Sequence, residues 1–376
     1  MKKAFKFLMA AGMTLSLAAC SNGGSSATAT PAPAEEGDDG VKIAVLLPFT
    51  GDQSYFDTLA TAAREVDAED NGISVQIFEV DPSGSADESL WMNAFADVCE
   101  DGEYDLVVFG NNTYEKYLYQ ACEKYPDQMF YNFDYSSLPE DGKVPANCYC
   151  VNWALDDLGY VVGTLSAEMT KTGTVGVVVG MDNQAMNQFI SGYVQVLADK
   201  GVKYVVSYPG KFDDPALGKE VTEEVIKKGA DVIWQVAGLT GNGVIAACAE
   251  HDDVWCIGVD QDQYLQFKES QPELAPTILT SALKNTNVAF KAVAGMVKDG
   301  TYADKLGKAE AWGIALNGVG LAENDYYMEN CPEEVRAAVA DTLAKVTAGE
   351  VEVKDTLEMT DYDAEWPELL NANRVE

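Results

Sequence analysis

From about residue 41 onward, short apolar runs alternate with longer segments whose apolar residues recur at helical spacing. A first series of strands and helices in turn, ending on two strands, is predicted at residues 41–47, 54–69, 73–80, 86–99, 105–109, 115–125, 128–134 and 148–152. A second series, beginning with a helix, is predicted at residues 158–170, 174–179, 185–200, 203–208, 215–228, 231–237, 242–250, 255–260, 277–281, 288–299, 309–316 and 331–348. This alternation predicts the α/β class, with mostly parallel sheets covered by crossover helices.

Two series of similar length predict two lobes, each a mostly parallel sheet flanked by helices, joined by a hinge. We expect one lobe from residues 41–153 plus about 284–325 and the other from residues 154–283, with a C-terminal helical segment at 326–376 packing on the lobes. Ligands of open α/β sheets bind beyond the carboxyl ends of the strands, so two lobes can close over a solute. A single doubly wound enzyme domain with additions fits the same periodicity.

The N-terminal segment has the pattern of an export signal. A basic start and an apolar run over residues 7–19 lead into Leu-Ala-Ala-Cys20, and the run is too short for a stable transmembrane helix. This ending resembles the lipobox of bacterial lipoproteins, which implies a signal peptide at 1–19 and a lipid on Cys20 that anchors the chain outside the cell membrane. A plain secretory signal with an incidental cysteine is the alternative. Residues 20–40 predict a flexible tether because they have almost no large apolar side chains.

Charge and residue counts exclude several functions. The formal net charge of −36 argues against nucleic-acid binding, which requires positive charge against phosphate. The single histidine, His251, lies in an acidic loop, and no cysteine spacing is typical of zinc. We find no nucleophile, metal or phosphate-binding motif, and therefore predict a monomeric binding protein without catalytic residues, metal or cofactor.

The strand predicted at 41–47 leads into a loop with candidate ligand contacts. Tyr55 and Phe56 are adjacent aromatic residues beside Asp52, a combination that suits a flat ring with polar edges. Alternatively, Asp52 caps the following helix and the two rings belong to the core.

Later strand ends add further candidates. Asp134 and Asp260 each follow an apolar strand, where a carboxylate could accept hydrogen bonds from vicinal hydroxyls, as in ribose, or could simply terminate a turn. Trp234, within the strand VIWQVAG, could stack on a ligand or fill the core. Lys284 is predicted to open a helix, where the dipole disfavours a cation, so either a specific partner or solvent must hold its charge.

These residues also carry a family resemblance. The stretches KKGADVIWQVAGLTGNGVIAACAEHDDVWCIGVDQDQ, ILTSALKN and NGVGLAEN resemble the basic membrane protein family, and the resemblance is collinear over about residues 41–325. Members are lipoprotein receptors of ABC transporters, similar in fold to type I periplasmic binding proteins. The resemblance implies that the chain captures a purine nucleoside and passes it to a transporter permease. An extracellular nucleoside-acting enzyme, or a sensor for another ring-containing ligand or sugar, remains the alternative.

The resemblance also implies roles for individual residues. Asp260 and Lys284 match family residues that contact ribose, while Gly238 and Gly241 match glycines where the backbone approaches the ligand.

Tyr55 matches a phenylalanine that stacks near the base, and Asp134 matches an aspartate near the base. Phe56 stands where many relatives have an asparagine that could bond the base. The ribose half of the site is thus retained in the resemblance, while the base half differs.

Overall fold

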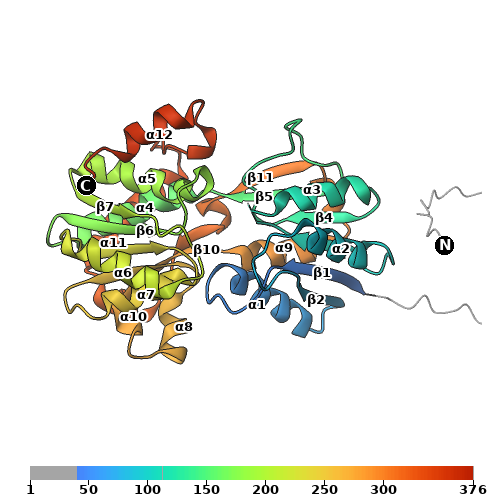
Figure 1. The fold of residues 1–376 in the computed structure, drawn as a ribbon, viewed down its shortest axis with the longest axis horizontal. Helices are drawn as coiled ribbons and strands as arrows, with labels where there is room; N and C mark the ends of the chain where they lie inside the picture. Colours follow the sequence, from blue (N-terminus) through green and yellow to red (C-terminus); the bar gives the residue numbers. More distant parts are fainter. Residues whose placement is uncertain (1–39, 112, 376) are drawn as a thin grey trace, which may run out of the picture. The chain divides into compact units, whose positions relative to one another are not determined.

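The computed structural model describes residues 40–111 and 113–375, which contain two six-stranded sheets (Figure 1). The predicted signal peptide, Cys20 and nearly all of the predicted tether lie outside the described residues. The predicted two-lobed α/β class is confirmed, because each sheet has helices packed against it.

The first lobe is built on the sheet β11-β5-β4-β3-β1-β2, in which every pairing is parallel. Its strands are β1 (Val41–Leu47), β2 (Ile73–Glu79), β3 (Leu106–Phe109), β4 (Met129–Asn132), β5 (Cys148–Trp153) and β11 (Lys308–Trp312). Its helices are α1 (Tyr55–Ala68), α2 (Glu88–Cys99), α3 (Glu115–Lys124) and α9 (Thr286–Lys298), with the short η2 (Tyr302–Lys305). The continuous apolar run of β1 fits a strand that is covered on both faces.

The second lobe is built on the sheet β12-β10-β9-β8-β6-β7, parallel except for the β10–β12 pair. Its strands are β6 (Thr174–Val179), β7 (Lys203–Ser207), β8 (Val232–Val236), β9 (Trp255–Asp260), β10 (Ile278–Lys284) and β12 (Val319–Leu321). Its helices are α4 (Leu155–Met169), α5 (Gln184–Lys200), α6 (Pro215–Lys227), α7 (Thr240–Cys248) and α8 (Gln263–Ser270), with η1 (Ala275–Thr277).

The chain crosses between the sheets three times, after β5, after β10 and between β11 and β12. The third crossing contains η3 (Ile314–Leu316). The crossings are bonded to one another: the Ala154 N–H donates to the Trp312 carbonyl at 3.3 Å, and the Asn285 N–H donates to the Gly318 carbonyl at 2.8 Å. This bonded set of crossings has the construction expected of a hinge.

The C-terminal segment packs on the second lobe. It comprises α10 (Asp325–Asn330), α11 (Glu333–Thr347), η4 (Thr356–Glu358) and α12 (Tyr362–Leu370). Helix α11 packs on α4, α12 packs on α5, and the Val375 N–H donates to the Tyr204 carbonyl at the β7 edge of the sheet.

Three details differ from the sequence expectations. Strand β12 belongs to the second sheet, although residues up to about 325 were assigned to the first lobe. Lys284 is the last residue of β10 and not the start of a helix, because its pairing with Val319 extends the strand. Helix α8 is absent from the sequence expectations, while α10 and α12 fall in the segment that is predicted only as helical, without individual bounds.

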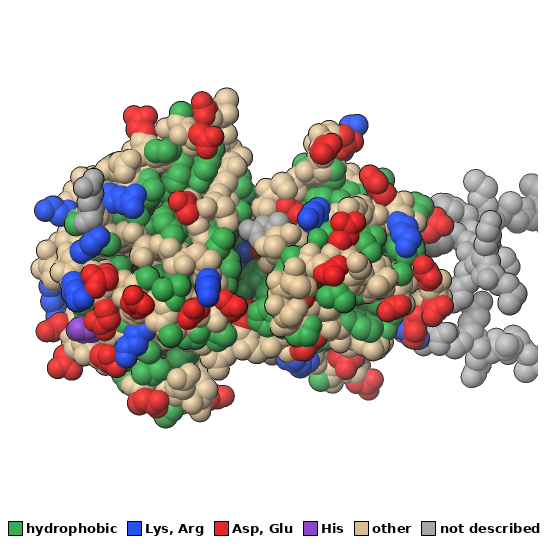
Figure 2. All heavy atoms as spheres, viewed as in Figure 1, with side chains coloured by type: hydrophobic (Ala, Val, Ile, Leu, Met, Phe, Trp, Pro, Cys, Tyr) green, Lys and Arg blue, Asp and Glu red, His purple; other side chains and the backbone are tan. Residues whose placement is uncertain are grey.

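Acidic side chains are spread over the visible faces of both lobes, and this face is hollowed where the lobes meet (Figure 2). Among the described residues, no helix has both the length and the apolar character needed to cross a membrane.

Candidate functional site

Four polar residues at strand ends meet between the two sheets. The Ser54 hydroxyl, in the loop after β1, donates to Asp260 Oδ2 at the end of β9 over 2.5 Å. The Lys284 ammonium, at the end of β10, donates to Asp134 Oδ2 in the loop after β4 over 2.6 Å. Three predicted site residues, Asp134, Asp260 and Lys284, are therefore brought together from opposite lobes.

Asp52 is bonded to its own loop. Its carboxylate accepts the backbone N–H groups of Ser54, Phe56 and Asp57 at 2.9–3.2 Å and is 5% exposed. Burial raises the pKa of Asp52, and the three donors act in the opposite direction. The capping alternative describes this residue, because its bonds hold the start of α1.

Tyr55 and Phe56 point in different directions. The Tyr55 hydroxyl donates to Asp134 Oδ2 over 2.5 Å, and the residue is partly exposed. Phe56 is buried, with its ring centroid 5.2 Å from Phe49 and 4.8 Å from Tyr55. Tyr55 thus belongs to the polar cluster, whereas Phe56 belongs to the core.

The ammonium of Lys284 is enclosed by aromatic rings. The residue is 4% exposed, and its nitrogen lies 4.9 Å from the ring centroid of Tyr55, 5.7 Å from that of Phe189 and 6.0 Å from that of Trp153. Ring faces and the Asp134 carboxylate both stabilise a desolvated cation. Of the two alternatives for Lys284, a specific partner and solvent, the structure shows a partner, Asp134 of the same chain.

Asp260 has an unusual environment. Its φ of +66° is rare for a residue with a side chain, and it is 7% exposed. Burial raises the pKa of Asp260 to about 6, although the ammonium of Lys284 acts in the opposite direction. Ser54 is the one described residue that donates to its carboxylate, so acceptor capacity remains for a ligand hydroxyl.

Three further predicted residues have structural surroundings. Trp234 is fully buried, with its ring 5.5 Å from Tyr193, which is a core position. Gly238 has a φ of +55°, and a Cβ on Gly241 would stand 1.8 Å from Gln235 Oε1. A side chain at position 238 would strain the backbone and one at 241 would displace Gln235, and Trp234 has no ring face open to a ligand in this conformation.

Four polar residues that join the lobes are absent from the residues predicted from the sequence. They are Ser54, Gln53, Gln263 and Asn242, whose side-chain Nδ2 donates to Gln53 Oε1 over 2.9 Å. Their positions, each after the end of a strand, are the signal that could have identified them.

The described part of the chain contains neither a disulfide nor a cluster of metal ligands. Its seven cysteines are free and buried, including Cys148 and Cys150 with sulfurs 3.7 Å apart. Burial holds the pKa of Cys148 well above its usual value, which disfavours the reactive thiolate. No group of three His, Cys, Asp or Glu residues in residues 40–111 and 113–375 is arranged to hold a metal.

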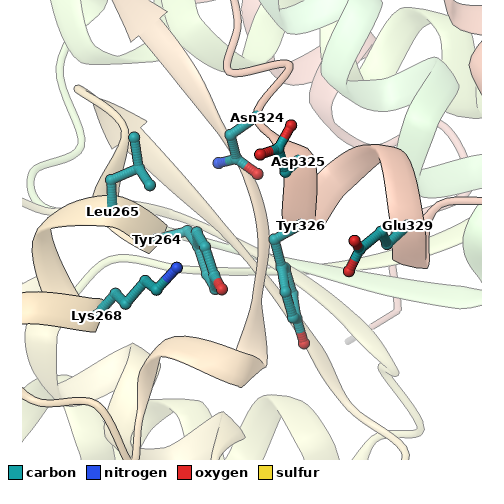
Figure 3. Close-up of a pocket in the computed structure, with 7 residues that line it drawn as sticks. All are labelled: Tyr264, Leu265, Lys268, Asn324, Asp325, Tyr326 and Glu329. Carbon is teal, nitrogen blue, oxygen red and sulfur yellow. The ribbon is translucent and has the colours of Figure 1, made fainter.

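A separate pocket of about 450 Å³ opens on the second lobe between α8 and α10 (Figure 3). Tyr264 and Tyr326 in its wall stack on each other with centroids 4.2 Å apart. Its lining is Tyr264, Leu265, Lys268, Asn324, Asp325, Tyr326 and Glu329. None of the strand-end residues lines it, so it is distinct from the cluster between the lobes.

Residues 41–355 match the family model Bmp, described as ABC transporter substrate-binding protein PnrA-like. The chain belongs to the Bmp family. The resemblance stated from the sequence is thereby confirmed, and the match covers both sheets and the interlobe cluster.

Individual relatives agree with the family assignment. The chain is 30% identical over 220 residues to the ABC transporter nucleoside-binding protein BmpA of Lactococcus lactis, covering 55% of this chain and 60% of that protein. It is 28% identical over 300 residues to the lipoprotein PYRAB04520 of Pyrococcus abyssi, covering 76% of this chain and 70% of that protein. The chain thus spans about 60% of the length of the Lactococcus relative.

A solved structure shares the fold. The ABC transporter solute-binding protein of Aeropyrum pernix superposes with a TM-score of 0.73 at 24% identity, covering 89% of this chain and 98% of that chain. At this identity the likeness concerns the fold alone.

Proposed function

We propose that the chain is the solute-binding lipoprotein of an ABC importer and that it captures a nucleoside, with purine nucleosides favoured, between its two lobes. The observation that carries this proposal is the meeting of Asp260, Lys284, Asp134 and Tyr55 at strand ends of both lobes. Membership of the Bmp family and the nucleoside-binding name of the Lactococcus relative support the ligand class.

The ribose would bind at Asp260. Its carboxylate already accepts a hydroxyl from Ser54, which is the chemistry that a sugar hydroxyl would supply. A charged acceptor bonded to a neutral hydroxyl contributes about 1.5–3 kcal/mol. Lys284 would contact the sugar once ligand rearranges its pair with Asp134.

The base would bind beside Tyr55. Tyr55 is partly exposed, and its ring would stack on the base, with Asp134 within bonding distance of its hydroxyl. Phe56 is buried beneath, so it would shape the base site only through its contact with Tyr55.

The charge of the cluster favours a neutral ligand. Asp134 and Asp260 are two carboxylates beside one ammonium, Lys284. A nucleotide phosphate would add negative charge with no unpaired cation to receive it, so nucleosides are preferred over nucleotides.

Delivery and location complete the proposal. The two lobes, with β12 in the second, would close over the ligand and present it to the permease. The chain would be a monomer outside the cytoplasm, anchored by lipid on Cys20, as the lipoprotein name of the Pyrococcus relative supports. It would act by binding alone, without catalysis.

A thermal-shift screen of residues 40–376, which form one compact unit, tests the ligand class. Ligand that binds only the folded state at a hundredfold excess over Kd adds about 2.7 kcal/mol of stability. We expect shifts with guanosine, adenosine or inosine, but not with ribose, free bases or nucleoside monophosphates. A shift only with another ring compound or a sugar would contradict nucleoside capture. Chromatography of the recovered ligand checks that it is chemically unchanged.

A further inference from the structure

We propose that residues 51–54 form a rigid contact arm that docks on the second lobe, and that Gln53, Asn242 and Gln263 are positioning residues which set the lifetime of the closed state. The inference rests on the proposed function only in that a ligand is retained between the lobes. Neither the family description nor the names of the relatives assigns a role to these three residues.

The contact arm is held rigid from its own lobe. The Asp57 carboxylate accepts the backbone N–H groups of Gly51 at 2.7 Å and Gln53 at 2.9 Å. Gly51 has a φ of +98° and Gln53 a φ of +54°. A glutamine in the left-handed region is disfavoured on its own, so these bonds are what hold it there. Together with the three donors on Asp52, five backbone N–H groups fix the loop.

The arm contacts the second lobe at three points. Gln53 Oε1 accepts from Asn242 Nδ2 on α7 over 2.9 Å, and the Gln53 carbonyl accepts from Gln263 Nε2 on α8 over 3.5 Å. The third point is the bond from Ser54 to Asp260. Two of the three contacts thus lie beside the proposed ribose acceptor and do not involve it.

The receiving surface on the second lobe is pre-organised. Gln235, Gln263 and Ser281 are fully buried. Gln235 Nε2 donates to Gln263 Oε1 over 2.6 Å, and the Gln263 N–H donates to the Ser281 hydroxyl over 3.1 Å. The same Gln263 oxygen accepts the Val259 N–H over 3.1 Å, next to Asp260. Buried, satisfied networks of this kind specify one side-chain arrangement.

Glycines make room for this network. A Cβ at position 241 would stand 1.8 Å from Gln235 Oε1, and one at position 258 would stand 2.6 Å from Gln263 Oε1. The ends of the two glutamine side chains therefore occupy space that a side chain at position 241 or 258 would fill. The Gln263 Oε1 accepts from Gln235 and Val259 within the second lobe, and the network thereby directs Gln263 Nε2 toward the arm.

The contact arm makes closure partly independent of ligand. The apparent affinity of a ligand is proportional to the fraction of molecules that are in the binding-competent state. Bonds between the lobes that do not involve ligand raise the closed fraction and slow opening, and thereby slow ligand release.

The test compares Gln53→Ala, Asn242→Ala and the double variant in the full chain, with guanosine as the probe. Gln76→Ala is the matched control, since Gln76 is exposed and accepts one side-chain bond, from Tyr104, within the first lobe. We expect guanosine to dissociate roughly three- to tenfold faster from each single variant. The double variant should be no faster than the singles, and the control should match the parent chain. Unchanged dissociation, or effects that multiply in the double variant, would overturn the proposal.

A ligand-free readout separates this proposal from the nucleoside assignment. Distances between spin labels at Asn93→Cys and Glu220→Cys, exposed positions on α2 and α6, report closure directly. Labelling is done on residues 40–376, which lack Cys20, and the described native cysteines are buried, so the introduced ones are the accessible thiols. The labelled parent should have a larger short-distance population than the labelled Gln53→Ala chain. Equal populations would refute the contact arm even if guanosine binds, whereas a difference without guanosine binding would refute only the nucleoside.

Discussion

Asp52 follows strand β1 and Asp260 is the last residue of strand β9, in opposite lobes, and both are buried with a raised pKa. The bonds that they make are different. Asp52 accepts three backbone N–H groups of its own loop, whereas Asp260 accepts one hydroxyl from the other lobe. A carboxylate whose acceptor positions are filled by its own backbone supports the loop, while one with positions left can receive a ligand.

The strongest test of this comparison is Asp260→Ala. We expect nucleoside affinity to fall by about 1.5–3 kcal/mol, roughly 10- to 150-fold in Kd, because the charged acceptor is lost. Isothermal titration measures the change. An unchanged affinity would contradict the assignment of ribose to Asp260.

The matching change, Asp52→Ala, should act on stability. Three N–H groups at the start of α1 would lose their acceptor, which we expect to lower the free energy of unfolding by about 2 kcal/mol. Urea unfolding gives this value. If affinity fell with no loss of stability, Asp52 would be a ligand contact after all.

The affinity for nucleoside should depend on pH through Asp260. Because the pKa of Asp260 is raised to about 6 from 3.8, its ionised form is available above pH 6 and is lost below it. Nucleoside affinity should therefore fall as pH drops through 6, by up to about tenfold per unit. Titrations between pH 5 and pH 8 test this, and Asp260→Asn should remove the dependence.

The folding stability of the ligand-free chain should depend on pH in the opposite direction. A carboxyl with a raised pKa binds its proton more tightly in the folded chain, so ionising Asp260 lowers the free energy of unfolding. This loss is complete above pH 6 and disappears toward pH 3.8. Asp260→Asn should therefore stabilise the ligand-free chain at pH 7.5 and not at pH 4. Asp156 and Asp157, with pKa values of about 8 and about 6 through burial, remain in both chains and cancel in the comparison.

The smallest expected effect is that of Tyr55→Phe. The ring and its stacking face stay, while Asp134 loses one donor and keeps Lys284. Affinity should change by about 1 kcal/mol or less. A titration calorimetry comparison with Tyr55→Ala, which removes the ring, separates stacking from the hydroxyl; equal losses in both variants would contradict a stacking role.

Strand ends could be predicted from the sequence because buried parallel strands are continuous apolar runs. The bounds of β1 and β6 were predicted to the residue. Helix α8 was missed because QYLQFKES is short and has only two buried residues. Strand β12 was missed because it has three residues, one of them a glycine, and pairs antiparallel.

The site was only partly predictable, for a different physical reason. Asp134, Asp260 and Lys284 could be grouped because strand ends share an edge of each sheet. The filling of the Asp52 acceptor positions by backbone N–H groups depends on the conformation of Gly51 and Gln53, which no local sequence pattern specifies. Lys284 was assigned a place at a helix start, and only its pairing with β12 shows that it ends a strand.

The pairing of β11 with β5 also governs how the chain acquires its structure. These strands are neighbours in the first sheet, yet the whole of α4 to β10 lies between them in sequence. Contacts of such large sequence separation form slowly, since a long loop must close before any bond is made. The first sheet thus lacks its β11 edge until residue 312 has emerged, and the β7 edge of the second gains its last partner from residue 375. Neither sheet therefore has all of its edge contacts until nearly the whole chain is available.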